Sequence, residues 1–263
     1  LRNLYDRLMY LRSLNDRKAV VLASIEEQGK LTAELKKSIE EAATLVVVED
    51  LYRPYRPKRR TRATIAKEKG LEPLANIILL QMTKEPLEKE AEVFVSEEKE
   101  VKTAKDAIAG ACDIIAESIS DEADYRMEIR RRTEAKGLIV STAKDEKAES
   151  VYENYYEFSE PVSKIAGHRV LALNRGEKEK FLNVKIEAPT EEILRYLEKK
   201  IITKENPQTK PVLQATIEDA YNRLIAPAIE REVRNQLTEK AEDGAITVSY
   251  THLRAHETGA YLV

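Results

Sequence analysis

The chain has 263 residues, of which 35% are charged and 42% hydrophobic, with no Trp, 8 Gly, 9 Pro and a net charge of -3. This apolar content exceeds that of a disordered chain. The scarcity of turn-forming residues excludes a sandwich or barrel of many short strands and favours helices. The longest apolar runs, 42–48 and 74–80, are far shorter than the roughly 20 residues of a membrane span. We therefore expect a cytoplasmic protein without a membrane segment.

The first half of the sequence predicts consecutive helices. Apolar residues spaced three and four apart indicate a long helix over 3–28, ended by Gly29. A second helix is expected over 32–45 with Thr32 as its N-cap, which makes an αα-hairpin. Two prolines three residues apart favour an extended stretch over 49–62. Further helices are expected over 64–69, 71–82, 103–118 and 121–136.

The second half mixes elements. A linker or bent helix is expected over 137–150, and the aromatic residues between 152 and 158 indicate a local core or a docking surface. Alternating apolar and polar residues predict a strand over 181–188. Later helices are expected to begin at Thr190 and Pro211. Pro227 predicts that one helix ends near Ile225 and another starts with this proline in its first turn.

These elements predict a mainly α fold, an elongated multi-helix scaffold with helix-turn-helix-like hairpins and a small β insertion. We divide it into an N-terminal helical domain over 1–140, whose start is truncated, and a central helical region over 141–247. Residues 248–258 match the translation of a transposon-type sequencing adapter, so we interpret 248–263 as a non-native tail.

The strongest local signal is positive charge. Residues 53–69 contain eight basic residues and one acid, Glu68, so this basic segment carries +7 in a chain of net charge -3. Guanidinium groups bind phosphates in a fork geometry, and tyrosine rings can stack on unpaired bases. Alternatively, the arginines pair with glutamates elsewhere in the chain or dock a protein. The candidate nucleic-acid contacts are Tyr52, Arg53, Tyr55, Arg56, Lys58, Arg59, Arg60 and Arg62.

Other charged or reactive residues predict little chemistry. The arginines at 126, 130, 131 and 132 are interpreted as a charged helix surface. Glu49 and Asp50 could hold a metal, although pairing with neighbouring arginines is favoured. Cys112, the single cysteine, is expected to be a small buried side chain, and His168 to be structural. No phosphate loop, dinucleotide turn or nucleophile elbow is present. We therefore expect no enzyme activity, no cofactor and no metal site.

Several separated motifs resemble the Tex family of bacterial transcription accessory proteins: residues 23–32, 51–66, 69–75, 169–177, 224–227 and 229–232. The resemblance covers residues 1–247. It implies a helical N-terminal region that precedes an RNase H-like YqgF domain, helix-hairpin-helix motifs and a nucleic-acid-binding OB-fold domain, all absent from this chain. It also implies that the first few dozen residues of the family are missing.

The function implied by this resemblance is that of a non-enzymatic, transcription-associated protein that binds RNA or DNA, mainly through the absent OB-fold and helix-hairpin-helix domains. Two alternatives stay open. In one, the helices dock RNA polymerase or the ribosome and position the downstream domains without binding nucleic acid. In the other, the family protein is a nuclease built on its RNase H-like domain, and this chain would then have no activity of its own.

Overall fold

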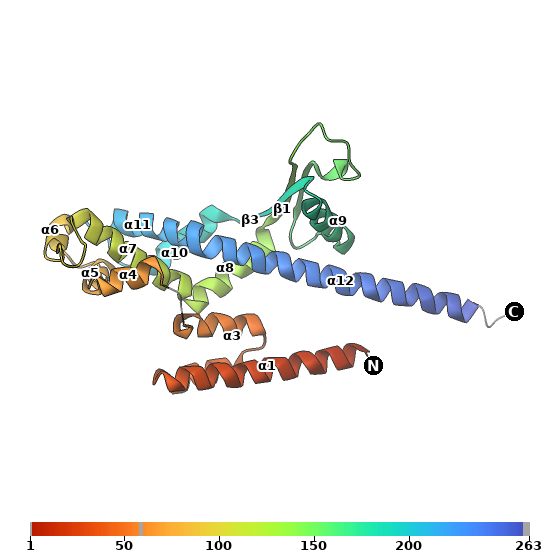
Figure 1. Cartoon of the computed structure of the whole chain (residues 1–263), viewed down its shortest axis with the longest axis horizontal. Helices are drawn as coiled ribbons and strands as arrows, with labels where there is room; N and C mark the ends of the chain where they lie inside the picture. The colour runs from red at the N-terminus through yellow and green to blue at the C-terminus, as the bar shows by residue number, and fades with distance from the viewer. Residues whose placement is uncertain (1, 58–59, 260–263) are drawn as a thin grey trace. The chain divides into compact units, whose positions relative to one another are not determined.

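The structure is a computed structural model that describes residues 2–57 and 60–259, with side chains described over 4–57 and 60–245 (Figure 1). Its described part is mainly α with one three-stranded antiparallel sheet, as expected. The chain packs into two compact units. Unit 1 takes the chain up to Glu128 and again over Leu194–Ile225, and unit 2 takes Ile129–Ile193 and the chain from Ala226 on. The expected domain boundary at 140 falls inside unit 2 and stays a prediction.

Unit 1 opens with three helices that share one core. They are α1 (Arg2–Glu27), α2 (Ala33–Glu41) and α3 (Leu45–Tyr52), followed by the 3-10 turn η1 (Arg53–Tyr55). Gly29 has φ +66°, a left-handed conformation that stops α1 where the sequence predicts. Thr32 caps α2, because its side chain accepts a hydrogen bond from the Leu35 amide. The core between the three helices is formed by Val21, Ile25, Ile39, Val48 and Tyr52.

The rest of unit 1 is arranged around α7 (Ala104–Asp121). The N-cap Thr103 and the third helical residue, Asp106, form a capping box, so the start of α7 is fixed by its sequence. Its buried face carries Ala107, Ala111, Ile115 and Ile119. The helices that pack against α7 are α4 (Arg62–Glu68), α5 (Glu72–Leu80), α6 (Leu87–Glu92) and α11 (Lys210–Asp219), together with the π-turn η3 (Ala220–Ile225).

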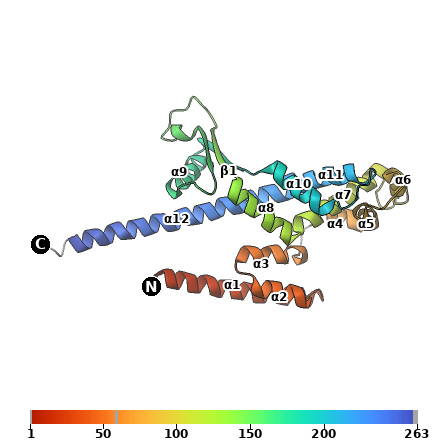
Figure 2. The same ribbon diagram turned by 180° about the vertical axis from the view of Figure 1, so that it is seen from behind.

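Unit 2 is built on the sheet, whose strand order is β2-β1-β3. Its strands are β1 (Leu138–Ala143), β2 (Glu157–Pro161) and β3 (Leu182–Glu187). β3 alternates buried and exposed residues along its length, as its pattern predicts. Its other elements are α9 (Gly167–Lys178), the turn η2 (Glu153–Tyr155) and α12 (Ala226–Gly259), and α9 lies beside α12 in both views (Figures 1 and 2). Helices α8 (Ala123–Lys136) and α10 (Thr190–Ile201) each contribute residues to both units.

The outer edge of β3 is satisfied by side chains of α12. The Ile186 amide donates to Glu230 Oε1 at 2.9 Å, and Arg234 Nη1 donates to the Val184 carbonyl at 2.9 Å. Glu230 and Arg234 are one helical turn apart, so a single face of α12 supplies both partners. This edge is therefore closed to pairing with another strand.

Most expected elements are confirmed. The long helices over 3–28, 103–118 and 121–136 correspond to α1, α7 and α8, and the strand over 181–188 corresponds to β3. The aromatic residues between 152 and 158 join a local core with Ile139, Leu173 and Leu182. Pro227 is the second residue of α12, directly after η3 ends at Ile225, as predicted.

Three local expectations are wrong. The helix expected over 32–45 ends at Glu41, because Thr44 caps a new helix by accepting a hydrogen bond from the Val47 amide. The stretch expected to be extended from residue 49 stays helical to Tyr55, since Pro54 lies in the first turn of η1, where proline is tolerated. The linker expected over 137–150 contains strand β1, which is stabilised by pairing with β2 and β3.

The C-terminal end of the described chain is helical. The backbone of α12 continues to Gly259, through most of the segment interpreted as a non-native tail, and 260–263 lie outside the described residues. The adapter origin of that tail stays a prediction. No helix in the described part of the chain is long and apolar enough to cross a membrane.

Candidate nucleic-acid interface

The basic segment connects η1 to the end of α4 within unit 1. Arg53 begins η1, Arg56 follows it with an extended backbone, and Thr61 caps α4 through a capping box with Thr64. Lys58 and Arg59 lie outside the described residues. The side chains of Arg56, Arg60 and Arg62 are exposed, and Arg53 is half-buried. The local sequence thus places several guanidinium groups on the surface of one short connection.

The two tyrosines of the motif pack against the core of the first three helices. Tyr52 is only 8% exposed, and its hydroxyl hydrogen-bonds with Ser24 Oγ at 2.9 Å. The Arg17 guanidinium lies over the same ring, 5.5 Å from its centroid. Tyr55 is half-buried against this core. Tyr52 is therefore part of the hydrophobic core, and Tyr55 is the more accessible ring, while base stacking by either stays a prediction.

Part of the basic segment forms ion pairs within unit 1. Arg60 Nη2 lies 3.0 Å from Glu68 Oε2, and Lys67 Nζ lies 3.9 Å from Glu72 Oε1. Lys69 Nζ donates to the Glu100 carbonyl at 3.2 Å and lies 3.6 Å from its carboxylate. The Arg60 and Glu68 side chains are 70% and 59% exposed. Such exposed pairs contribute about 0–1 kcal/mol each, so they compete only weakly with an external phosphate.

Two of the four arginines of α8 are buried, so they do not form the charged surface that the sequence predicts. Arg126 is fully buried and its Nε donates to Asp50 Oδ1 at 2.7 Å within unit 1. In unit 2, Arg130 is largely buried and binds Glu232 through Nε at 3.0 Å and Nη2 at 2.7 Å. Arg132 and Lys136 both donate to Glu192, at 2.8 and 2.6 Å. Arg131 is exposed.

The burial of these arginines follows the geometry of the helix and has no hydropathy signal in the sequence. The buried residues of α8 fall at positions 126, 129, 130 and 133, the spacing of one helical face. Because two of them are arginines, the face does not stand out as apolar, and hydropathy patterning misses it. Asp50 has Arg126 as its partner, and Glu49 accepts a hydrogen bond from Arg17 Nε at 2.6 Å. Both acids are therefore paired, as favoured, although with arginines distant in sequence.

The residues considered for nucleophilic chemistry lie in different units. Cys112 is half-buried on α7 in unit 1, where burial raises the pKa of its thiol despite a hydrogen bond with Thr216. A raised pKa lowers the thiolate fraction at neutral pH, which disfavours nucleophilic use. His168 is exposed near the start of α9 in unit 2. Across the described residues, no group of three or more His, Cys, Asp or Glu side chains is placed to hold a metal.

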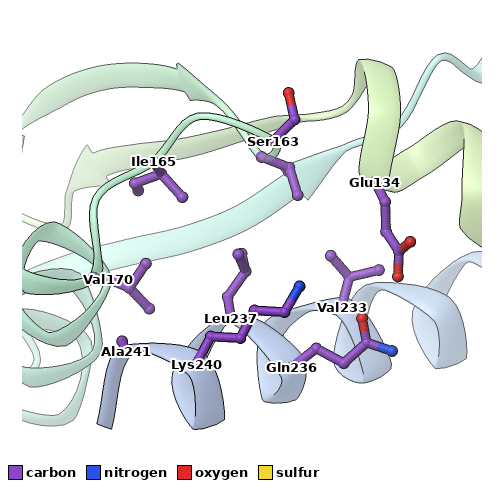
Figure 3. Close-up of a pocket in the computed structure, with 11 residues that line it drawn as sticks. Glu134, Ser163, Ile165, Val170, Val233, Gln236, Leu237, Lys240 and Ala241 are labelled. Atoms are coloured by element: carbon purple, nitrogen blue, oxygen red, sulfur yellow. The ribbon is translucent and has the colours of Figure 1, made fainter. Parts of the chain in front are cut away.

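Unit 2 contains a pocket of about 360 Å³ between α12 and the connection from β2 to α9 (Figure 3). Val170, Val233 and Leu237 give it an apolar wall, and Glu134 and Lys240 bring opposite charges to its rim. Gly167 closes one side, since a Cβ there would lie 3.1 Å from Ala241 Cα. None of the sequence-predicted contact residues lines this pocket.

Comparison with known proteins identifies the family. A family model described as Tex central region-like matches residues 81–249. The chain belongs to this family. It is 51% identical over 252 residues to protein YdcI of Bacillus subtilis, covering 95% of this chain and 35% of YdcI. It is 36% identical over 264 residues to the transcriptional accessory protein Tex of Neisseria gonorrhoeae, covering 97% of this chain and 34% of that protein.

A more distant relative is the human S1 RNA-binding domain-containing protein 1. It is 27% identical over 270 residues, which cover 97% of this chain and 27% of the human protein. This chain thus spans about a third of the length of its bacterial relatives and less of the human one. The resemblance to the Tex family, drawn from motifs scattered along the chain, is confirmed.

Proposed function

We propose that this chain is the helical scaffold of a Tex-like transcription accessory protein and that its basic segment contacts the phosphates of RNA or DNA. The observation that carries the proposal is the segment's charge of +7, with Arg56, Arg60 and Arg62 exposed on one connection. Support also comes from the relatives' names, one of which denotes a transcriptional accessory protein and another an RNA-binding domain.

The proposed contacts are mainly electrostatic. Arginine forks bind phosphate oxygens bidentately, and each neutralised phosphate releases counterions. Phosphate contacts position a strand without reading its sequence. Tyr55 adds a partly exposed ring for stacking. The chain acts without catalysis or cofactor in this proposal, in the cytoplasm, and the downstream domains of longer Tex proteins contribute most of the affinity.

A second function is favoured by the ion pairs within the basic segment. Arg60, Lys67 and Lys69 each have a carboxylate partner in unit 1. These ion pairs hold the side chains in place, as expected of a surface that docks a protein. In this alternative the chain holds downstream domains or docks RNA polymerase or the ribosome, without touching nucleic acid.

The two functions predict different salt dependence. We would replace Lys58, Arg59, Arg60 and Arg62 by Gln and measure affinity for a single-stranded oligonucleotide at three salt concentrations. If the four residues bind phosphates, the slope of log K against log salt flattens by up to about 3, from roughly 0.7 per contact on single strands. Replacing Tyr55 by Leu should weaken binding without changing the slope.

A matched control removes four positive charges elsewhere in unit 1. Lys36, Lys37, Lys199 and Lys200 are exposed and lie outside the basic segment, so their replacement by Gln lowers the net charge equally. The control should keep most of the wild-type slope. If the basic-segment variant keeps the wild-type slope, the phosphate proposal is wrong and docking is favoured. The same conclusion follows if the two variants have equal slopes.

A further inference from the structure

A slot of about 250 Å³ lies between α4 and α7 in unit 1, and the C-terminal part of the basic segment lines it. Each helix lines it with residues at the spacing of a single face. From α4 and its C-cap these are Arg62, Ala66 and Lys69, and from α7 they are Asp106, Gly110 and Asp113. Small residues thus form the middle of the slot, and charged residues its ends. Arg62, Ala66 and Lys69 belong to both the slot and the basic segment.

The two ends of the slot carry different groups. Asp113 accepts a hydrogen bond from Arg223 Nη2 at 3.0 Å, and Arg223 also binds Asp219. Hydrogen bonding to Arg223 lowers the pKa of Asp219, and the positive charge of Arg62 lowers it further. At the other end, Lys69 binds Glu100, and Asp106 Oδ2 accepts a hydrogen bond from the Thr103 amide.

The floor of the slot is apolar and closed. A Cβ on Gly110 would lie 3.4 Å from Ala66 Cβ of α4 and 2.4 Å from Cδ1 of Leu71, the N-cap of α5, so a larger residue at 110 would displace the Leu71 side chain. Ala109 is exposed and also lines the slot. An apolar floor between two hydrogen-bonding ends is suited to an aromatic heterocycle.

The charge of the slot argues against a phosphate. Two cations, Arg62 and Lys69, line it together with three carboxylates, those of Glu100, Asp106 and Asp113. A neutral, planar group with both donors and acceptors on its edges suits this mixture. A nucleobase has these properties, and enzymes that bind single bases hold them by stacking and by hydrogen bonds to their edges.

We propose that the slot holds one base of a single strand whose phosphates contact Arg56 and Arg60 of the basic segment, that Arg62 binds this base instead of a phosphate, and that the slot prefers guanine. This inference rests on the proposed phosphate contacts. Guanine presents the O6 and N7 acceptors that an arginine binds bidentately. Its N1–H and N2–H groups are adjacent donors, and ionised carboxylates only accept hydrogen bonds. Arg62 and the carboxylates of α7 are thus the groups that read the base.

The test compares two 12-nucleotide probes, a dT oligonucleotide and the same oligonucleotide with one central dG, by fluorescence anisotropy on the 263-residue chain. We expect the dG probe to bind about tenfold more tightly, within the range of a good bidentate base contact. The slope of log K against log salt should be the same for both probes, because they carry the same phosphates.

A blocking variant locates the base. Ala109→Phe fills the slot without changing charge and should abolish the preference for dG while leaving the affinity for the dT probe unchanged. Ser118→Phe, at an exposed position of α7 outside the slot, is the matched control and should keep the preference. If Ala109→Phe lowers the melting temperature, the smaller Ala109→Leu replaces it.

The outcomes separate this inference from the proposed function. Salt-dependent binding of the dT probe with no gain from dG overturns the base slot and leaves the phosphate contacts standing. A preference for dG that survives both Ala109 variants also overturns it, because the base then lies elsewhere. Failure of the wild-type chain to bind either probe overturns both proposals and leaves a protein side chain as the occupant of the slot.

Discussion

The basic segment and α8 are both rich in arginine, but their arginines lie in different environments. Arg60 in the basic segment is 70% exposed and pairs with an exposed glutamate, whereas Arg126 in α8 is fully buried against Asp50. The difference arises from what packs around each element. The basic segment is a surface connection, while α8 is covered on the face that carries Arg126, Ile129 and Arg130. Arginine content alone therefore does not identify a nucleic-acid surface, and exposure must be known as well.

The largest effect is expected from removing the partner of the buried arginine. Asp50→Asn leaves the Arg126 guanidinium buried beside a neutral amide, and we expect a loss of about 3–5 kcal/mol in the free energy of unfolding. Urea denaturation checks this. The double variant Asp50→Leu with Arg126→Leu should recover part of the loss, since it buries no charge. If Asp50→Asn lowers the free energy of unfolding by less than about 1 kcal/mol, the buried arginine of α8 contributes no more to stability than an exposed arginine of the basic segment.

A smaller effect is expected at the partly buried pair of unit 2. Glu232 accepts two hydrogen bonds from Arg130, and its side chain is 27% exposed. Glu232→Gln should cost about 1.5–3 kcal/mol, the range for hydrogen bonds to charged groups. The same denaturation experiment measures it, with Glu239→Gln, which lies on the same helix, as control. If Glu232→Gln and Asp50→Asn lower the free energy of unfolding equally, the contribution of these ion pairs does not depend on how deeply they are buried.

The pair at Glu192 adds a dependence on pH. Hydrogen bonding from Lys136, and the nearby charge of Arg132, lower the pKa of Glu192 from its ordinary value of 4.5. A carboxylate whose folded pKa is depressed stabilises the protein above that ordinary value, and the contribution is lost as pH falls through the folded pKa. Glu192→Gln should therefore be less stable than wild type at pH 7, with the difference shrinking towards pH 3. Urea midpoints at both pH values test this, and a constant difference would contradict it.

The smallest effect is expected at the basic segment itself. Glu68→Gln removes the partner of Arg60, as Asp50→Asn removes that of Arg126, but both side chains here are largely exposed. We expect a change of at most about 0.5 kcal/mol, because solvent screens such pairs. Melting curves of this variant beside Asp50→Asn measure the contrast directly. A large loss of stability in Glu68→Gln would indicate that the basic segment stabilises the fold through this ion pair and is not free to bind a partner.

Elements with local signals could be predicted from the amino-acid sequence. Gly29 ends α1, Thr32 and Thr103 cap their helices, and Pro227 separates η3 from α12, because conformational freedom, capping and the missing proline amide act within a few residues. Strand β3 was also predictable, since one of its faces is buried and the other exposed. Family membership followed from motifs that are short and ordered along the chain.

The burial of charged residues and the formation of β1 depend on contacts between residues that are distant in sequence. β1 contains Ile139, Val140 and Thr142, which favour strands, but it lacks alternation of apolar and polar residues, and its pairing with β2 and β3 fixes it as a strand. Tyr52 and Arg126 belong to the core because groups distant in sequence, Ser24 and Asp50, provide their hydrogen-bond partners. Likewise, the slot between α4 and α7 is lined by residues of two helices that are distant in sequence. Such long-range partners leave no local pattern, since burial of a polar group depends on the partner it meets.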